Sequence, residues 1–103
     1  MAVFRLTTTD RSLREAVAVD APSSDVIVGY GVRPTVRLFG QGGSGRAVQY
    51  TTSPEAMILA GTAIWEDWPL GVVSIDTIDL VAGAITGLRL TQPGGAMTWE
   101  VVA

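Results

Sequence analysis

Cysteine, histidine and lysine are all absent from this chain of 103 residues. The lack of cysteine excludes disulfides, thiolate nucleophiles and zinc–thiolate sites. The lack of histidine excludes Ser-His-Asp and Cys-His catalytic arrangements and removes the commonest ligand of transition metals. Only carboxylates remain for acid–base chemistry, so the sequence predicts a protein that is not an enzyme and that carries no cofactor or metal.

Basic residues and long apolar runs are also scarce. Seven arginines stand against ten acidic residues, which gives a formal net charge of -3, the reverse of the balance in nucleic-acid-binding proteins. Charged or turn residues interrupt every apolar run before the ~18 residues of a membrane span. The opening MAVFRLTTTD lacks the basic and then apolar segments of a secretory signal. We therefore expect neither nucleic acid nor membrane as a partner, and a chain that stays in the cytoplasm where it is made unless cell lysis or particle assembly carries it out.

Apolar residues, by contrast, are plentiful at 48%, whereas charged residues make up only 17%, below the usual quarter or so. A chain of this length is expected to form a single domain over residues 1–103. Such a domain buries roughly 60% of its unfolded surface, which is enough for a stable core without disulfides or a structural metal. The apolar surplus indicates surface left over for a partner.

The pattern of short apolar runs predicts an all-β fold. Val, Ile and Thr are frequent, and turn residues separate the runs at intervals typical of sandwiches and barrels. The prediction is a single antiparallel β-sandwich of about eight short strands. Between Asp10 and Val19 helical and strand spacings compete, and we favour strand for the second half. The candidate strands are Val3 to Thr7, Glu15 to Asp20, Asp25 to Gly29, Thr35 to Phe39, Arg46 to Thr52, Thr62 to Trp68, Val72 to Leu80, Ala84 to Thr91 and Ala96 to Val102.

The last two strands are predicted to pair as an antiparallel hairpin, because Gln92-Pro93-Gly94-Gly95 supplies turn residues between them. Met97, Trp99 and Val101 then share one face and point into the core. The apolar phase shifts near Thr86-Gly87, which predicts a bulge. A similar shift near Asp76-Thr77 predicts a second bulge or a strand that passes between sheets.

At most one short helical turn is expected, near residues 54–60. Ser53 as N-cap, Pro54 at the first helical position and Gly61 at the end bracket it.

The glycines of GQGGSG, Gly40, Gly42 and Gly45, satisfy the spacing of the dinucleotide fingerprint. That motif requires a following helix, whereas Arg46 to Tyr50 alternates as a strand, so we interpret it as a loop. The carboxylates Asp76 and Asp79, and Glu66 and Asp67, are the only candidates for an acid–base pair or a calcium site. Their strand parity separates them, and solvated turns are the favoured interpretation.

Trp65 and Trp68 would leave a strand on opposite faces, so one ring is expected in the core and the other at the rim. Trp68, followed by Pro69, is the candidate for the more exposed ring. Arginine without lysine is compatible with ion pairs between subunits, or simply with a GC-rich genome.

Residues 48–102 contain a Tyr-x-Thr-Ser-Pro turn, a Gly-Thr-Ala-x-Trp strand, a Trp-Pro-x-Gly turn, a Thr-Gly-Leu-Arg strand and a Glu-Val-Val end. This progression, over about half of the chain, resembles small virion proteins of tailed bacteriophages and prophages. The residues that carry the resemblance are Tyr50, Ser53, Pro54, Gly61, Trp65, Trp68, Gly71, Leu88, Arg89, Gly95 and Glu100.

The resemblance implies a virion structural protein, and we expect a capsid decoration or cement protein that binds non-covalently as a homo-oligomer. Its partners would be the major capsid protein or other virion proteins, and its location the virion, with the host cytoplasm during assembly. A head–tail adaptor, fibre-base or tail component of the same particle remains an alternative. The candidate interface residues are Trp68, Arg37, Arg89, Tyr50 and Tyr30.

Two other classes stay open. A carbohydrate-binding module would contact glycans through Trp68 with Tyr30 or Tyr50 as coplanar exposed rings. A hydrolase that uses carboxylates alone would need two acids facing one cleft at roughly 5–10 Å. Its candidates are Glu66, Asp67, Asp76, Asp79 and Glu100.

Overall fold

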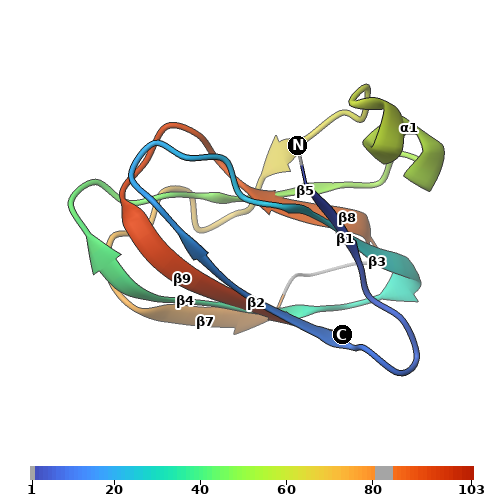
Figure 1. Ribbon diagram of the computed structural model, residues 1–103, viewed down its shortest axis with the longest axis horizontal. Helices are drawn as coiled ribbons and strands as arrows, with labels where there is room; N and C mark the ends of the chain where they lie inside the picture. Colours follow the sequence, from blue (N-terminus) through green and yellow to red (C-terminus); the bar gives the residue numbers. More distant parts are fainter. Residues whose placement is uncertain (1, 81–84) are drawn as a thin grey trace.

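Two packed β-sheets make up the protein, shown as a computed structural model in Figure 1. The structure describes residues 2–80 and 85–103, with the backbone only of 30–32 and 80. Its elements are β1 (Val3–Arg5), β2 (Ser12–Val17), β3 (Asp25–Val32), β4 (Thr35–Gly42), β5 (Val48–Thr51), α1 (Glu55–Ala60), β6 (Glu66–Asp67), β7 (Thr77–Leu80), β8 (Ile85–Leu90) and β9 (Ala96–Val102). A five-stranded sheet has the order β1-β3-β8-β5-β6 and a four-stranded sheet the order β2-β9-β4-β7.

This architecture confirms the predicted all-β sandwich with one short helix. The strand pairs are antiparallel except for β1 and β3, which run parallel. Within the ambiguous stretch between Asp10 and Val19, β2 covers Ser12–Val17, so the preference for strand in the second half is confirmed for residues 15–17, whereas the predicted continuation to Asp20 is wrong. Several predicted strands are shorter in the structure, and the predicted start at Ala84 lies outside the described residues.

The core lies between the two sheets and is filled by alternate residues of the central strands. Val26, Leu88 and Val48 face inward from the five-stranded sheet, and Val36 and Trp99 face them, all 0% exposed. Each such side chain contributes about 1.5–3 kcal/mol through removal of apolar surface from water. The predicted inward face of the last strand, Met97, Trp99 and Val101, is confirmed.

The predicted hairpin between the last two strands is wrong. β8 pairs with β3 and β5, whereas β9 pairs with β2 and β4, so residues 91–95 connect the two layers. Both strands have a continuous apolar face, and in the sandwich these faces oppose one another across the core. The turn residues between two strands carry no information on whether the strands pair or stack.

The irregularity predicted near Thr86-Gly87 exists, but the extra residues lie on the partner strand. Gly87 stands opposite Ile27, and Ile85 stands opposite Val32. Between these two pairs β3 therefore contains more residues than β8, and the extra residues form the irregularity. Near Asp76-Thr77 the chain passes between layers, which was one of the two alternatives. Val73 forms a bridge with Arg46 just before β5, and Thr77 begins β7 in the other sheet.

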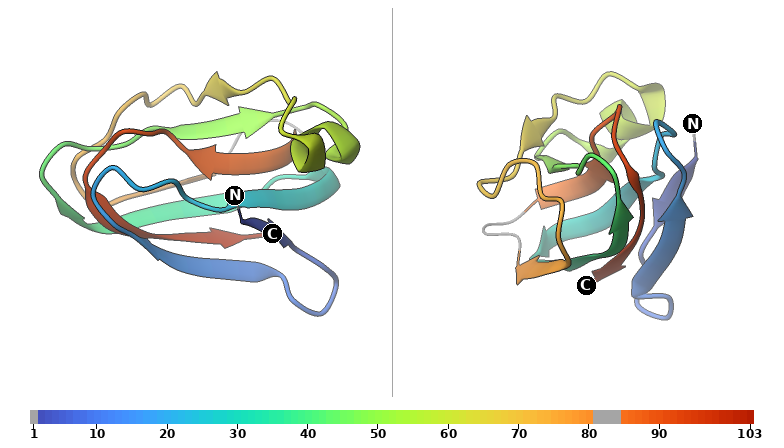
Figure 2. Two further views of the ribbon diagram at one scale, coloured as in Figure 1. Left: turned by 45° about the horizontal axis from the view of Figure 1, so that its top comes forward. Right: turned by 90° about the vertical axis from the view of Figure 1, so that its left-hand side faces the viewer.

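Helix α1 lies over one end of the outer face of the five-stranded sheet (Figure 2). Ile58 is its buried residue, and it packs directly on β8: a Cβ on Gly87 would lie 2.8 Å from Ile58 Cδ1, so a larger residue there would require Ile58 to shift. Gly61 ends the helix with φ 75°, as predicted. Ser53 is not the N-cap: Pro54 holds that place, and Ser53 Oγ accepts a hydrogen bond from the Ile64 amide.

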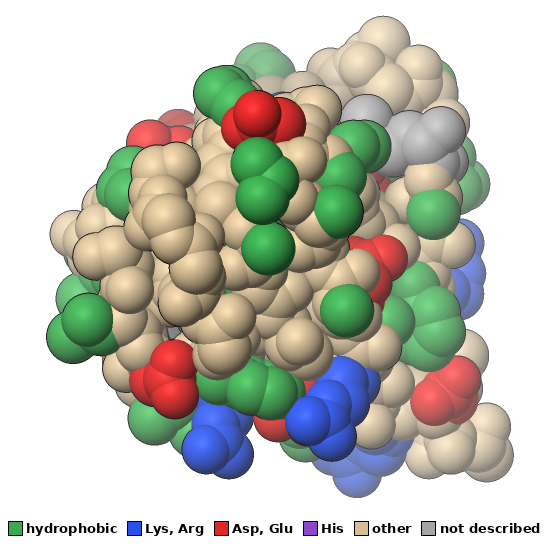
Figure 3. Space-filling model, turned by 60° about the vertical axis from the view of Figure 1, so that its left-hand side comes forward, with side chains coloured by type: hydrophobic (Ala, Val, Ile, Leu, Met, Phe, Trp, Pro, Cys, Tyr) green, Lys and Arg blue, Asp and Glu red, His purple; other side chains and the backbone are tan. Residues whose placement is uncertain are grey.

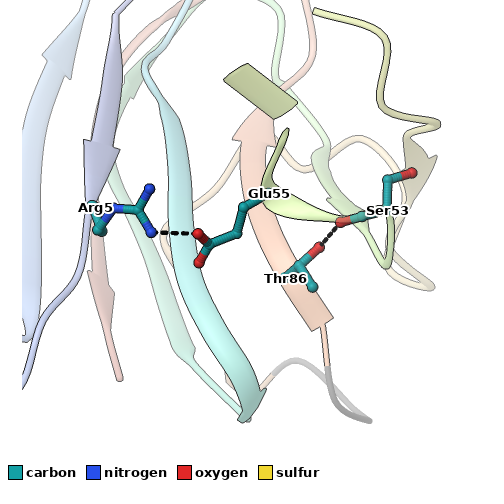
Figure 4. Close-up of polar contacts among 4 residues, drawn as sticks. All are labelled: Arg5, Ser53, Glu55 and Thr86. Atoms are coloured by element: carbon teal, nitrogen blue, oxygen red, sulfur yellow. Dashed lines mark hydrogen bonds and ion pairs between the residues drawn. The ribbon is translucent and has the colours of Figure 1, made fainter. Parts of the chain in front are cut away.

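Two polar contacts fasten the helix to the sheet (Figure 4). Arg5 on β1 forms an ion pair with Glu55 in the first turn of α1. Thr86 Oγ1 on β8 donates to the Ser53 carbonyl just before the helix. These contacts hold the N-terminal end of the helix against β1 and β8.

The glycine-rich segment is followed by strand β5 and not by a helix, so the dinucleotide interpretation fails. The loop interpretation is confirmed only for the second half of the segment, because Gly40 and Gly42 belong to β4. Its last glycine is required by close packing. A Cβ on Gly45 would lie 1.9 Å from the Val73 carbonyl oxygen.

Candidate ligand groove and docking face

A row of four polar residues crosses the outer face of the five-stranded sheet. Gln49 on β5 stands opposite Arg89 on β8 and opposite Asp67 on β6. The register of Val26 with Leu88 places Asp25 opposite Arg89 on the other side. Since Val26 and Leu88 point into the core, their neighbours in sequence point outward. The row therefore reads Asp25, Arg89, Gln49, Asp67 across β3, β8, β5 and β6.

Hydrogen bonds connect three members of this polar row. Arg89 Nε donates to Gln49 Oε1 at 3.0 Å, and Gln49 Nε2 donates to Asp67 Oδ1 at 2.9 Å. The Arg89 guanidinium lies 4.3 Å from the centroid of the Trp65 ring. A cation–π contact at this distance fixes the plane of the guanidinium.

The polar row forms the floor of a groove with a volume of about 390 Å³, within the ~300–1,000 Å³ range of small-molecule sites. Besides the four floor residues, its walls are formed by Pro22, Ser23, Leu90, Thr91 and Gln92. Ser23 is held in place by accepting a hydrogen bond from the Leu90 amide at 2.9 Å. We call this feature the polar groove.

Asp25 is the exceptional residue of the polar groove. It is only 3% exposed, and its Oδ1 has no hydrogen-bond partner among the described residues. Burial raises the pKa of Asp25, and the charge of Arg89 opposes that rise. An ionisable group buried without a full set of partners is costly and is typical of sites that receive a ligand.

A second surface lies on the outer face of the four-stranded sheet. Arg14 on β2 and Arg37 on β4 place their guanidinium groups 5.1 and 5.5 Å from the centroid of the Phe39 ring. Glu100 on β9 lies between the two arginines and is 3.9 Å from Arg14. The neighbouring Ile78, opposite Arg37 on β7, is 65% exposed.

We call this surface, made of Arg14, Arg37, Phe39, Ile78, Glu100 and Val102, the docking face. Figure 3 shows basic side chains gathered with hydrophobic ones along the lower edge of the molecule, where the four-stranded sheet lies in Figure 1.

The structure separates the predicted interface residues. Arg89 lies in the polar groove and Arg37 on the docking face, on opposite sheets. Tyr50 is half-buried against the core, and its hydroxyl donates to Glu66 Oε2 at 3.3 Å. Tyr30 lies on β3, and its side chain is outside the described residues.

The expectation that Trp68 is the more exposed ring is wrong. Trp68 is 3% exposed, and its indole Nε1 donates to the Gly71 carbonyl at 2.7 Å. Trp65 is the half-exposed ring and stacks on Arg89. The expectation that one ring lies in the core and the other at the rim is confirmed, and only the assignment is reversed: Trp68 belongs to the core cluster, whereas Trp65 packs on Arg89 at the outer face.

The acidic residues weighed from the sequence do not gather in one place. Glu66 and Asp67 bind Tyr50 and Gln49, as described above, and Asp76 Oδ1 accepts from the Gly40 amide at 3.2 Å. In residues 2–80 and 85–103 no group of three acidic side chains is placed to hold a metal ion.

Two important residues were missed from the sequence. Asp25 begins β3 and stands before an apolar run, and nothing in its local pattern indicates a buried carboxylate. Arg46 is 0% exposed and donates to the carbonyl oxygens of Ala18, Ala21, Thr91, Gly94 and Gly95. No sequence signal indicates this role, because the close packing next to Arg46, at Gly45, is visible only in the structure.

Comparison with protein-family models, with curated proteins and with solved structures finds no match for this chain. Within the described part of the chain there is also no helix with the length and apolar character that crossing a bilayer requires. Function has to be argued from the fold class, an all-β sandwich, and from the chemistry of its two surfaces.

Proposed function

We propose that this protein is a structural component of a bacteriophage virion, a capsid decoration or cement protein that binds the shell as a homo-oligomer. The observation that carries the proposal is the docking face, where two arginines flank an aromatic ring beside exposed aliphatic side chains. Arginine and aromatic residues are enriched in protein interfaces, whereas lysine is depleted. The resemblance of residues 48–102 to small virion proteins supports a phage particle as the assembly in which this contact is made.

In this function the protein works by contact alone. Ile78 and Val102, 65% and 51% exposed, would lose that apolar surface to a neighbouring subunit. Arg14 and Arg37 would pair with carboxylates of the partner and set its register, because guanidinium groups form paired hydrogen bonds with carboxylates. No covalent step is needed, so a chain without cysteine and histidine can perform this function.

A head–tail adaptor, fibre-base or tail component would use the same kind of face and differs only in its neighbour in the particle. The hydrolase is disfavoured. Of the five acids considered for it, Asp67 is the one that lines the polar groove among the described residues, and its Oδ1 already accepts from Gln49. The groove therefore does not bring together two of these carboxylates, which glycosidases hold at about 5–9.5 Å from each other.

The test has two stages. Mass spectrometry of purified particles of the phage that encodes the gene should detect the protein, and its absence there contradicts the proposal. Purified protein should then cosediment with shells that lack it, and Ile78→Asp should abolish that binding. Leu59→Asp is the matched control, because Leu59 is similarly exposed at 59% but lies on α1 over the other sheet. Equal binding by both variants would contradict the assignment of the docking face.

A further inference from the structure

The polar groove lies on the opposite sheet from the docking face and needs an explanation of its own. Its floor alternates in hydrogen-bonding character: Asp25 accepts, Arg89 donates, and Asp67 accepts at the far end. Among the described residues, no acceptor is paired with Nη1 or Nη2 of Arg89, whose Nε is used by Gln49. Unused donors and an unused buried acceptor therefore face the same cavity.

The charges of the floor argue against a ligand of a single sign. A cation drawn to Asp25 would also lie beside the guanidinium of Arg89, and an anion drawn to Arg89 would lie between two carboxylates. A neutral ligand that both donates and accepts hydrogen bonds meets neither repulsion. Each hydroxyl group donates one hydrogen bond and accepts two, which matches the alternation of the floor.

The walls of the groove fit the same chemistry. Pro22 supplies apolar surface, while Thr91 and Gln92 supply further polar groups. A pyranose ring has apolar C–H faces and a belt of hydroxyl groups, so it can use both kinds of wall. The volume of about 390 Å³ is suited to a small ligand of one or two rings.

We propose that the polar groove is a binding site for a neutral saccharide, held by hydrogen bonds from its hydroxyl groups to Asp25, Arg89 and Asp67. The site differs from the platform of coplanar rings that the sequence left open as an alternative, since Trp68 is buried. Trp65 takes a supporting role by fixing the guanidinium of Arg89 from outside the groove. No bond of the saccharide is broken.

This inference does not depend on the virion assignment. Because the groove and the docking face lie on opposite outer faces of the sandwich, a subunit docked through the four-stranded sheet would keep the groove open to solvent. A docked copy could then hold a glycan on its outward side.

The experiment is a titration of the full chain with neutral probes: methyl glycosides of glucose, galactose, mannose and N-acetylglucosamine, and the disaccharides maltose, cellobiose and chitobiose. Two-dimensional NMR spectra should show shifts at the side-chain amides of Gln49 and Gln92 and at Arg89 Nε with at least one probe at millimolar concentration. Trp65 fluorescence should change in parallel.

Asp25→Asn and Asp67→Asn should each weaken that binding about tenfold or more, since hydrogen bonds to charged groups are worth about that much. Asp76→Asn is the matched control, because Asp76 caps the Gly40 amide outside the groove and should leave affinity unchanged. Melting curves confirm that each variant is folded, and Asp67→Asn remains informative if Asp25→Asn perturbs the fold.

Three results would overturn the proposal: no probe shifts the groove signals, the shifts lie on another surface, or lysine and arginine methyl esters bind while neutral sugars do not. The last result would assign the groove to a cationic side chain of a protein partner. Failure of the particle tests above would leave these measurements unaffected, so the two proposals can fail separately.

Discussion

Replacing Arg46 with lysine is the sharpest test of what holds the two layers together. The guanidinium has five N–H donors, and the five carbonyl oxygens that it contacts lie 2.7–3.2 Å away. These carbonyls belong to residues 18–21 and 91–95, the segment before β3 and the connection between β8 and β9. A single buried side chain thus joins both connections to the start of β5.

The expected loss follows from the donor count. A lysine ammonium has three donors, so at least two of the five carbonyl oxygens lose their partner in Arg46→Lys. Each buried acceptor left unpaired costs about 1–3 kcal/mol, which makes about 2–6 kcal/mol in total. A domain of about 100 residues loses roughly 4 °C of Tm per kcal/mol, so Tm should fall by about 8–24 °C.

Urea unfolding followed by tryptophan fluorescence and by far-UV circular dichroism measures the change. Arg37→Lys is the control, because Arg37 is exposed on the docking face, and it should change the free energy of unfolding by less than about 0.5 kcal/mol. Burial lowers the pKa of Arg46, and the charge of Asp20 opposes this. Burying the cation therefore has a free-energy cost that offsets part of the stabilisation from its hydrogen bonds. If Arg46→Met were more stable than Arg46→Lys, that cost would outweigh the carbonyl contacts and the reasoning would be refuted.

Further predictions concern pH and packing. Burial raises the pKa of Glu15, but hydrogen bonds from Ser24 and Trp99 outweigh it and lower the pKa below its ordinary 4.5, so Glu15→Gln should destabilise the protein by about 1–3 kcal/mol at neutral pH. The deficit should disappear as the pH falls below 4.5 through the lowered folded-state pKa. Asp25→Asn should do the opposite, because the pKa of Asp25 is raised: it should stabilise the protein at neutral pH, with an advantage that vanishes as the pH falls towards 3.8. Urea titrations at a series of pH values test both signs, and parallel curves for wild type and variant would contradict them. Gly45→Ala should cost more than about 2 kcal/mol through its clash with the Val73 carbonyl, whereas Gly42→Ala, where a Cβ meets nothing within 4 Å, should be near neutral; equal urea midpoints would disprove the packing argument.

The accuracy of the sequence predictions followed the range of the interactions involved. Helix α1 was predicted within its bounds because Pro54 and Gly61 act on the backbone next to them. The inward face of β9 was predicted because alternation is a property of one strand. The pairing of β8 with β9 was predicted wrongly because it depends on which layer each strand joins. Trp65 and Trp68 lie on opposite faces, as alternation predicts, but the choice of the core ring was wrong because it depends on which face of the sheet the other layer covers.

The candidate site shows the same division. Arg89 was selected from the sequence and lines the polar groove, but its neighbours come from β3, β5 and β6, which are far apart in the chain. Asp25 was not selected, because a carboxylate before an apolar run looks the same whether the strand end is solvated or covered. Only the register between strands brought the two together.

What the sequence determined by itself is the chemistry and the class of fold. A chain without cysteine, histidine and lysine can use only carboxylates, guanidinium groups, amides and hydroxyls, and its short alternating runs make it β. What the tertiary structure decided is which charges lie in water and which do not. Arg46 is buried because residues 18–21 and 91–95, distant in sequence, pack around its guanidinium group. Asp25 is buried although its local sequence does not differ from that of a solvated strand end.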